Sequence, residues 1–188
     1  MRWLAAAVLS LLTLLAAPQG TLADPVPLAY QVTARLGAVP ERILFAVALQ
    51  ESGSDHTGQL LPWPWTLNVA GEARRYNTRK QTCSALMDAL SQWPGQRVDV
   101  GLCQINIGFH GSRVAHPCDL IDPYQNLQIA ATILREQHSQ TRDWLRAVER
   151  YHRPAGGSIA TEYREKVEQH LQRLGRRDQN QRSGGASP

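Results

Sequence analysis

From Pro40 to Gly53 the chain reads PERILFAVALQESG. Proline and an acid are both favoured in the first turn of a helix, so Pro40-Glu41 predicts a helix start. Apolar side chains then recur at helical spacing, at Ile43, Leu44, Val47 and Ala48. Continuing that stripe by three and four residues leads to Glu51. The stretch therefore predicts a core helix whose last turn carries a carboxylate on the buried side.

Glu51 has two interpretations from periodicity alone. On the core-facing side at the end of a helix, desolvation and the negative end of the helix dipole both raise the pKa of a carboxyl group. A carboxylic acid that stays protonated near neutral pH is the general acid that glycosidic cleavage requires. Alternatively, Ser52-Gly53 already turns the chain outward, and Glu51 is an ordinary solvated glutamate. Periodicity leaves both interpretations open.

Outward from this helix, the pattern predicts a single, mostly helical domain. Further helices are expected over residues 27–36, 78–93, 122–138, 143–152 and 159–174, with Gly and Pro at most of their ends. The alternating residues of 65–76, with a turn at Gly71, predict a hairpin or an extended lip. The fold class is thus a predominantly helical α+β domain over residues 24–174. The polar, Gly- and Ser-containing residues 175–188 are expected to form a disordered tail.

The first residues have the layout of a secretory signal. Met1-Arg2-Trp3 carries one positive charge, an apolar run follows from Leu4 to Ala17, and small residues end the segment at Ala23. An uncleaved membrane anchor is the alternative, but this run is shorter than the ~20 residues that span a bilayer. We expect residues 1–23 to be removed on export, leaving a periplasmic or secreted protein with no membrane span.

Composition excludes several function classes. The 188 residues hold 20 Lys and Arg against 16 Asp and Glu, a formal net charge of +4, without the concentrated basic stripe of a nucleic-acid-binding protein. No Gly-rich phosphate loop and no His-Glu-x-x-His sequence occurs, so neither a cofactor nor a catalytic metal is predicted. A metal site joining Cys103 or Cys118 to His110 and His116 would match no standard zinc spacing.

Three cysteines follow the predicted signal, so one pair can be bridged after export. Cys103 lies in an apolar run and resembles a small buried hydrophobic residue. By elimination, Cys83 and Cys118 are the favoured disulfide pair, on the condition that their geometry permits the bond.

Three ordered motifs resemble those of the soluble lytic transglycosylase family, whose fold is similar to goose-type lysozyme. Ala48-Leu49-Gln50-Glu51-Ser52-Gly53 resembles its Glu-Ser motif, and Val100-Gly101-Leu102-Cys103-Gln104-Ile105-Asn106 resembles its Gly-Leu-Met-Gln-Ile motif. Asp122-Pro123 and Asn126-Leu127 resemble the start of its next core helix, and Ala147-Val148-Glu149-Arg150-Tyr151-His152 resembles a third motif ending Ala-Tyr-Asn. Cys103 stands in place of the usual methionine, and His152 in place of the asparagine.

The resemblance implies an enzyme that cleaves the bond between N-acetylmuramic acid and N-acetylglucosamine in peptidoglycan and leaves a 1,6-anhydro ring. It implies that Glu51 is the catalytic acid and base, and that Tyr151 hydrogen-bonds and orients it. Ser52 would support Glu51 or the substrate, and Gln104, with Asn106 of the same motif, would line the substrate cleft. Each also has a plain structural interpretation: Tyr151 as a core aromatic residue, and Ser52 as a helix cap.

Two features keep alternatives open. Asp99 is either a second carboxylate, as in a hydrolytic muramidase, or a turn or strand-end aspartate, and the latter is favoured. Trp63 and Trp65 lie in a Pro-broken loop, where they stack on sugars at the cleft rim or pack a loop lid. The surrounding residues 61–68 are similar to a stretch in transglycosylases of conjugation and type IV secretion systems, whose components are therefore expected partners. A non-catalytic glycan-binding assembly protein is the third hypothesis.

Overall fold

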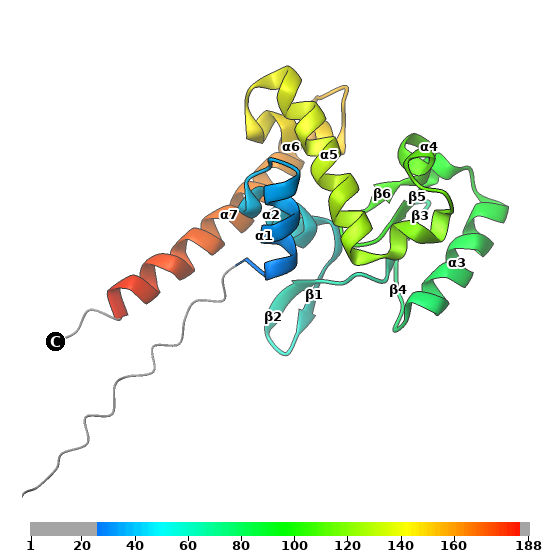
Figure 1. Cartoon of the computed structure of the whole chain (residues 1–188), viewed down its shortest axis with the longest axis horizontal. Coiled ribbons are helices and arrows are strands. Elements are labelled where there is room, and N and C mark those ends of the chain that lie inside the picture. The colour runs from blue at the N-terminus through cyan, green and yellow to red at the C-terminus, as the bar shows by residue number, and fades with distance from the viewer. Residues whose placement is uncertain (1–25, 185–188) are drawn as a thin grey trace, which may run out of the picture.

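The computed structural model describes the backbone of residues 26–184 and the side chains of residues 26–176. The predicted signal segment lies outside the described residues. Figure 1 shows two groups of elements, a bundle of helices on one side and a small sheet with its own helices on the other. The molecule is thus α+β and predominantly helical, which confirms the expected lysozyme-like fold class.

The helical group surrounds α2, which is the helix predicted from the opening stretch. It consists of α1 (Leu28–Leu36), α2 (Glu41–Ser52), α5 (Pro123–Thr141), α6 (Trp144–His152) and α7 (Ser158–Gly184). Helix α2 packs against α1 and α7, and α6 packs against both α5 and α7. All four residues of the predicted apolar stripe on α2 are buried. Burial of that stripe is what places the end of α2 between the two groups.

The second group is built on a four-stranded antiparallel sheet of order β4-β3-β5-β6. Its strands are β3 (Thr66–Val69), β4 (Glu72–Arg75), β5 (Val98–Val100) and β6 (Ile105–Asn106). Strands β3 and β4 form the hairpin predicted over residues 65–76. The helices α3 (Arg79–Gln92) and α4 (Ile107–His110) flank the sheet (Figure 1). A separate hairpin of β1 (Gly53–His56) and β2 (Gln59–Pro62) continues directly from α2.

Side-chain caps fix the starts of three helices within a residue of the predicted boundaries. The Thr78 hydroxyl accepts a hydrogen bond from the Gln81 amide at the start of α3. Asp122 caps α5 and Asp143 caps α6, and each accepts bonds from two backbone amides of the first turn. These side chains satisfy amides that would otherwise lack a partner at a helix start.

The last helix is longer than the sequence predicts. A disordered tail is expected over residues 175–188, whereas α7 continues to Gly184 and extends away from the rest of the molecule (Figure 1). Residues 176–182 are mainly Arg and Gln and include no proline, so the segment favours continuation of a helix. Residues 185–188 lie outside the described part.

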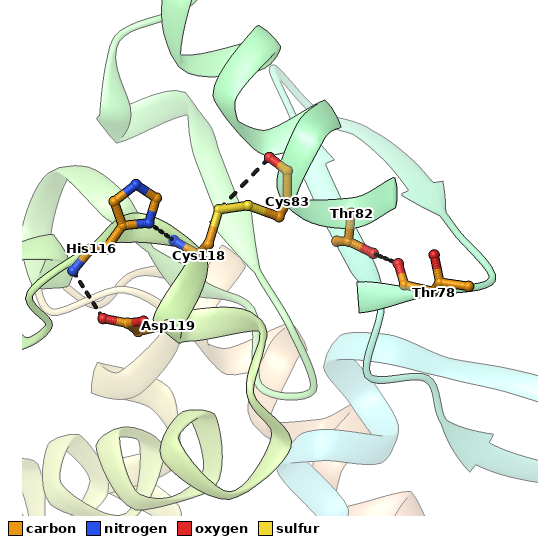
Figure 2. Close-up of a disulfide and its surroundings, with 6 residues drawn as sticks. All are labelled: Thr78, Thr82, Cys83, His116, Cys118 and Asp119. Atoms are coloured by element: carbon orange, nitrogen blue, oxygen red, sulfur yellow. Dashed lines mark hydrogen bonds between the residues drawn. A yellow bond between two sulfur atoms is a disulfide. The ribbon is translucent and has the colours of Figure 1, made fainter. Parts of the chain in front are cut away.

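A disulfide joins Cys83 of α3 to Cys118 of the 3-10 helix η3 (Pro117–Ile121), and their Cα atoms are 5.3 Å apart. It is the pair that elimination favours, and Figure 2 shows its surroundings. His116 caps η3: its Nδ1 atom accepts from the Cys118 amide, and its own amide donates to Asp119. Cys103 is fully buried and free.

Within the described residues, no helix combines the length and the apolar character that crossing a membrane requires.

Candidate active site

A cavity of about 600 Å³ lies where the end of α2 meets the sheet. Both groups of elements contribute to its wall, since α2, α5 and α6 line one part and β3, β5, β6 and α4 line another. Its polar side chains include Glu51, Asn68, Asp99, Gln104 and Asn106. Three of these are residues that the sequence analysis assigns to the site, Glu51, Gln104 and Asn106.

Glu51 lies in the last turn of α2, half-buried in the cavity wall. Its Oε1 atom accepts a hydrogen bond of 2.6 Å from the Tyr163 hydroxyl. The pKa of the Glu51 carboxyl is raised to about 8, chiefly because burial desolvates the group; the Tyr163 hydrogen bond opposes this shift, and the charge of nearby Asp99 adds to it. The carboxyl group is therefore mostly protonated at neutral pH, as a general acid must be.

Tyr163 replaces Tyr151 as the partner of Glu51, so the predicted Tyr151–Glu51 hydrogen bond is wrong. The Tyr151 hydroxyl instead donates to the Cys103 carbonyl oxygen at 2.6 Å, although Tyr151 does line the cavity. The reason is packing: α7 lies against α2 and brings Tyr163 to the carboxyl group. Tyr163 shares the apolar stripe of α7 with Ala160 and Val167, a pattern that does not distinguish a site residue from a core aromatic residue.

Ser52 has a structural position and does not reach the cavity. Its side chain is fully buried, and its hydroxyl donates to the Leu102 carbonyl oxygen at 2.7 Å. Of the two roles expected for Ser52, this position favours support of Glu51 over contact with substrate. Because the chain leaves α2 sharply after Ser52, a Cβ atom at Gly53 would clash with the Leu49 carbonyl. The Ser52 bond joins the end of α2 to the second motif and so holds Glu51 beside it.

The turn of the second motif is organised by Asn126, which is fully buried on α5. Its amide nitrogen donates to the carbonyl oxygens of Val100 and Leu120, both at 2.8 Å, and its oxygen accepts from the Cys103 amide at 2.9 Å. Gly101 has a φ of +83°, and a Cβ atom there would overlap the Asn126 amide group. The motif therefore needs both a glycine and an asparagine, for steric and hydrogen-bonding reasons.

Gln104 follows this turn with a φ of +46°, a left-handed conformation uncommon for a residue with a side chain. Its amide nitrogen donates to the Gly101 carbonyl oxygen at 2.8 Å and to that of Thr66 at 3.2 Å. These bonds hold Gln104 at the cavity wall in a conformation that the rest of the turn enforces.

Asp99 and Asn106 lie opposite each other on β5 and β6. The Asn106 amide donates to Asp99 Oδ1 at 2.8 Å, and both side chains line the cavity. Burial raises the pKa of the Asp99 carboxyl, and the Asn106 bond partly opposes that shift. Asp99 is thus in a strand with its carboxyl group at the cavity, and the favoured interpretation as a turn or strand-end aspartate is incomplete.

Neither Trp63 nor Trp65 is among the residues that line the cavity, so their expected contact with substrate at its rim stays a prediction. Trp63 stacks on His56, packs edge-on against Trp65, and donates from Nε1 to the Tyr76 carbonyl oxygen at 2.7 Å. These contacts agree with the other interpretation that the sequence allows, in which the tryptophans pack a loop.

The exposed phenyl side chain at the cavity is that of Phe109 of α4, whose relative exposure is 71%. Phe109 cannot be identified from the sequence, because a lone phenylalanine carries no signal of its own.

Within residues 26–176, no group of three or more His, Cys, Asp or Glu side chains is arranged to hold a metal ion.

Comparisons of the chain with curated proteins and with solved structures each gave no significant match. The family model described as the transglycosylase SLT domain matches residues 30–172, which include every element from α2 to α6. Members of this family are lytic transglycosylases, which cleave glycosidic bonds in peptidoglycan. The chain therefore belongs to the transglycosylase SLT domain family.

Proposed function

We propose that Glu51 is the single acid and base of a reaction that converts peptidoglycan strands into products with 1,6-anhydromuramic ends. The observation that carries this proposal is the Glu51 carboxyl group itself, which has a pKa of about 8 and faces a cavity lined by the second motif. A protonated carboxyl group at neutral pH can donate a proton to a glycosidic oxygen without a second acid.

In the first step, Glu51 gives its proton to the oxygen that bridges N-acetylmuramic acid to N-acetylglucosamine. The bond from the anomeric carbon to that oxygen breaks, and the acetamido oxygen of the same muramic residue bonds to the anomeric carbon. In the second step, the Glu51 carboxylate takes the proton of the muramic C6 hydroxyl. The C6 oxygen then displaces the acetamido oxygen, so the ring closes, Glu51 is protonated again and no water is consumed.

Tyr163 supports both steps through its hydrogen bond to Glu51. The bond stabilises the carboxylate that exists between the two steps, and it fixes which carboxyl oxygen faces the Tyr163 hydroxyl. Gln104 and Asn106, which line the same cavity, are proposed to bind substrate there. Tyr151 is proposed to act indirectly: its hydroxyl donates to the Cys103 carbonyl oxygen and so holds the second motif in place.

A hydrolytic muramidase is the second candidate, and Asp99 is the observation that favours it. The Asp99 carboxyl group lines the same cavity as Glu51, so a second carboxylate is available to activate water. Its hydrogen bond from Asn106 supports the alternative role of ordering that side chain at the wall. The two roles differ in their products, since hydrolysis leaves reducing ends.

We further propose that the protein is exported and opens peptidoglycan for a conjugation or type IV secretion apparatus. The predicted signal over residues 1–23 and the Cys83–Cys118 disulfide both support export, since disulfides persist in oxidising compartments. The resemblance of residues 61–68 to transglycosylases of such systems supports the association with the apparatus. In cells that carry Glu51→Gln, the transfer of DNA or protein through the apparatus should then fall. Unchanged transfer would contradict this role.

The test of the chemistry is a digest of purified peptidoglycan by the wild type, Glu51→Gln and Asp99→Asn, with mass spectrometry of the released fragments. We expect anhydromuramic products from the wild type and from Asp99→Asn, and none from Glu51→Gln. Reducing-end products that depend on Asp99 would favour the muramidase. If no variant releases fragments although all bind peptidoglycan, the protein is a non-catalytic assembly protein.

A further inference from the structure

The imidazole ring of His152 stacks directly on the phenol ring of Tyr163. The ring centroids are 4.3 Å apart and the ring planes are inclined by only 4°. His152 is the last residue of α6, and Tyr163 lies on α7, so the contact joins two helices across the cavity wall. His152 lines the cavity with Glu51, whereas Tyr163 is 5% exposed behind it.

From this stack we infer that His152 is a positioning residue for the Tyr163–Glu51 hydrogen bond. A tyrosine hydroxyl moves through a wide arc when its ring tilts, so the bond to Glu51 needs a ring that is held in place. The imidazole lies flat against one face of the phenol ring, and this contact resists the tilt. Within the described residues, neither ring nitrogen of His152 has a hydrogen-bond partner, so the stack is its principal contact.

The electrostatic surroundings favour a neutral ring in this position. Burial, together with the charges of Lys166 and Arg153, lowers the pKa of the His152 imidazole. The stack therefore persists at neutral pH without a change of charge beside Glu51. The inference rests on the proposed function, because it gives His152 a role only through the general acid.

The predicted consequence is a change in the pKa of the Glu51 carboxyl group. The titratable groups that face Glu51 are Tyr163 on α7, Asp99 on β5, Tyr151 on α6 and the Cys103 thiol. Of these, Tyr163 lowers the pKa of Glu51, by donating to its carboxylate. Losing the stack weakens that bond, so His152→Ala should raise the pKa of the Glu51 carboxyl group, and Tyr163→Phe, which removes the bond, should raise it as well.

The experiment is a pH titration of the Glu51 side-chain carbon by NMR, in protein labelled at glutamate and with the signal assigned from Glu51→Gln. We expect His152→Ala to raise the pKa of Glu51 by up to about one pH unit, and His152→Phe, which keeps a stacking ring, to leave it near the wild-type value. In a Tyr163→Phe background, His152→Ala should add nothing, because the bond is already absent.

His138→Ala is the matched control, because His138 stacks on Trp144 at 3.8 Å and neither residue lines the cavity. It should leave the pKa of Glu51 unchanged. In peptidoglycan digestion, His152→Ala should lower kcat by about 2- to 10-fold with little change in KM. An unchanged pKa in His152→Ala, with a raised one in Tyr163→Phe, would overturn the inference. The proposed function can also fail separately. If the variants change the pKa of Glu51 as expected but the wild type forms no anhydromuramic product, the proposed function is overturned and the positioning role of His152 is not.

Discussion

Phe109 is the exposed phenyl side chain among the lining residues of the cavity. An exposed phenyl ring at a cavity offers an apolar face of the kind on which sugar rings pack. Its position is set by Asn106, whose side chain accepts a hydrogen bond from the Phe109 amide and caps α4. The residue therefore has no evident role in the core and a suitable position for holding glycan.

Replacing Phe109 by alanine should weaken glycan binding and leave the chemical step nearly intact. If the ring packs on sugar equally in the bound substrate and in the transition state, KM should rise by about 3- to 10-fold with little change in kcat. The measurement is binding of Phe109→Ala to soluble peptidoglycan strands in a Glu51→Gln background, so that cleavage does not interfere. Tyr124→Ala is the control, since Tyr124 is 63% exposed but lies away from the cavity. Equal losses in both variants would contradict a specific role for Phe109.

Helix α2 and the sheet meet through few contacts, and these decide the arrangement of the site. The Ser52 hydroxyl bonds the end of α2 to the Leu102 carbonyl of the second motif, and the Gln104 side chain bonds to the Thr66 carbonyl of β3. Asn126 of α5 holds the intervening turn. Each of these side chains donates to or accepts from backbone of a different element, so the turn is fixed from three sides.

These contacts explain which parts of the structure the sequence predicts. The start of α5 follows from Asp122-Pro123, and the stripe on α2 identifies Glu51, since both patterns are local. The β1–β2 hairpin was missed because its short strands are only half-buried and alternate weakly, although Thr57 and Gly58 both adopt positive φ in its turn.

Site contacts between helices could not be read from the sequence. Tyr163 and Tyr151 lie on different helices, and both are tyrosines on apolar stripes. Only the packing of α7 against α2 makes Tyr163 the partner of Glu51. The tryptophans show the same limit, because a Pro-broken loop excludes a helix but does not say whether its side chains face substrate or one another.

The disulfide between α3 and η3 should contribute substantially to stability. It closes a loop with a sequence separation of 35, and the chain-entropy estimate for such a loop is about 4 kcal/mol. We therefore expect the Cys83→Ser, Cys118→Ser double variant to lose about 2–4 kcal/mol of unfolding free energy in urea denaturation.

Cys103→Ala provides the control for that measurement, because Cys103 is buried and free. This variant should lower the free energy of unfolding because it removes a buried side chain from the core. It keeps the disulfide, so a reductant should still lower its stability. The double variant should show no such sensitivity. A double variant as stable as the wild type would show that the disulfide does not constrain the unfolded chain.

At the scale of the whole molecule, the fold keeps a carboxyl group in a site where its charged form is poorly solvated, and this costs stability. The pKa of Glu51 in the folded protein is about 8, against 4.5 for the ordinary side chain. Between these values the folded state retains a proton that the unfolded state releases. The free energy of unfolding therefore falls as pH rises from about 4.5 to about 8, and the loss is complete above that range.

Glu51→Gln removes this titration while keeping the size of the side chain. The variant should match the wild type near pH 4 and exceed it at pH 9, by on the order of 2–4 kcal/mol, in parallel thermal or urea unfolding at the two pH values. Glu165→Gln on α7 is the control, because Glu165 is exposed and its substitution should change stability little at either pH. A Glu51→Gln variant that is no more stable than the wild type at pH 9 would contradict a buried, protonated Glu51. In the proposed reaction, the same burial that raises the pKa keeps a proton available for the glycosidic oxygen, so stability and the proposed catalysis oppose each other at this residue.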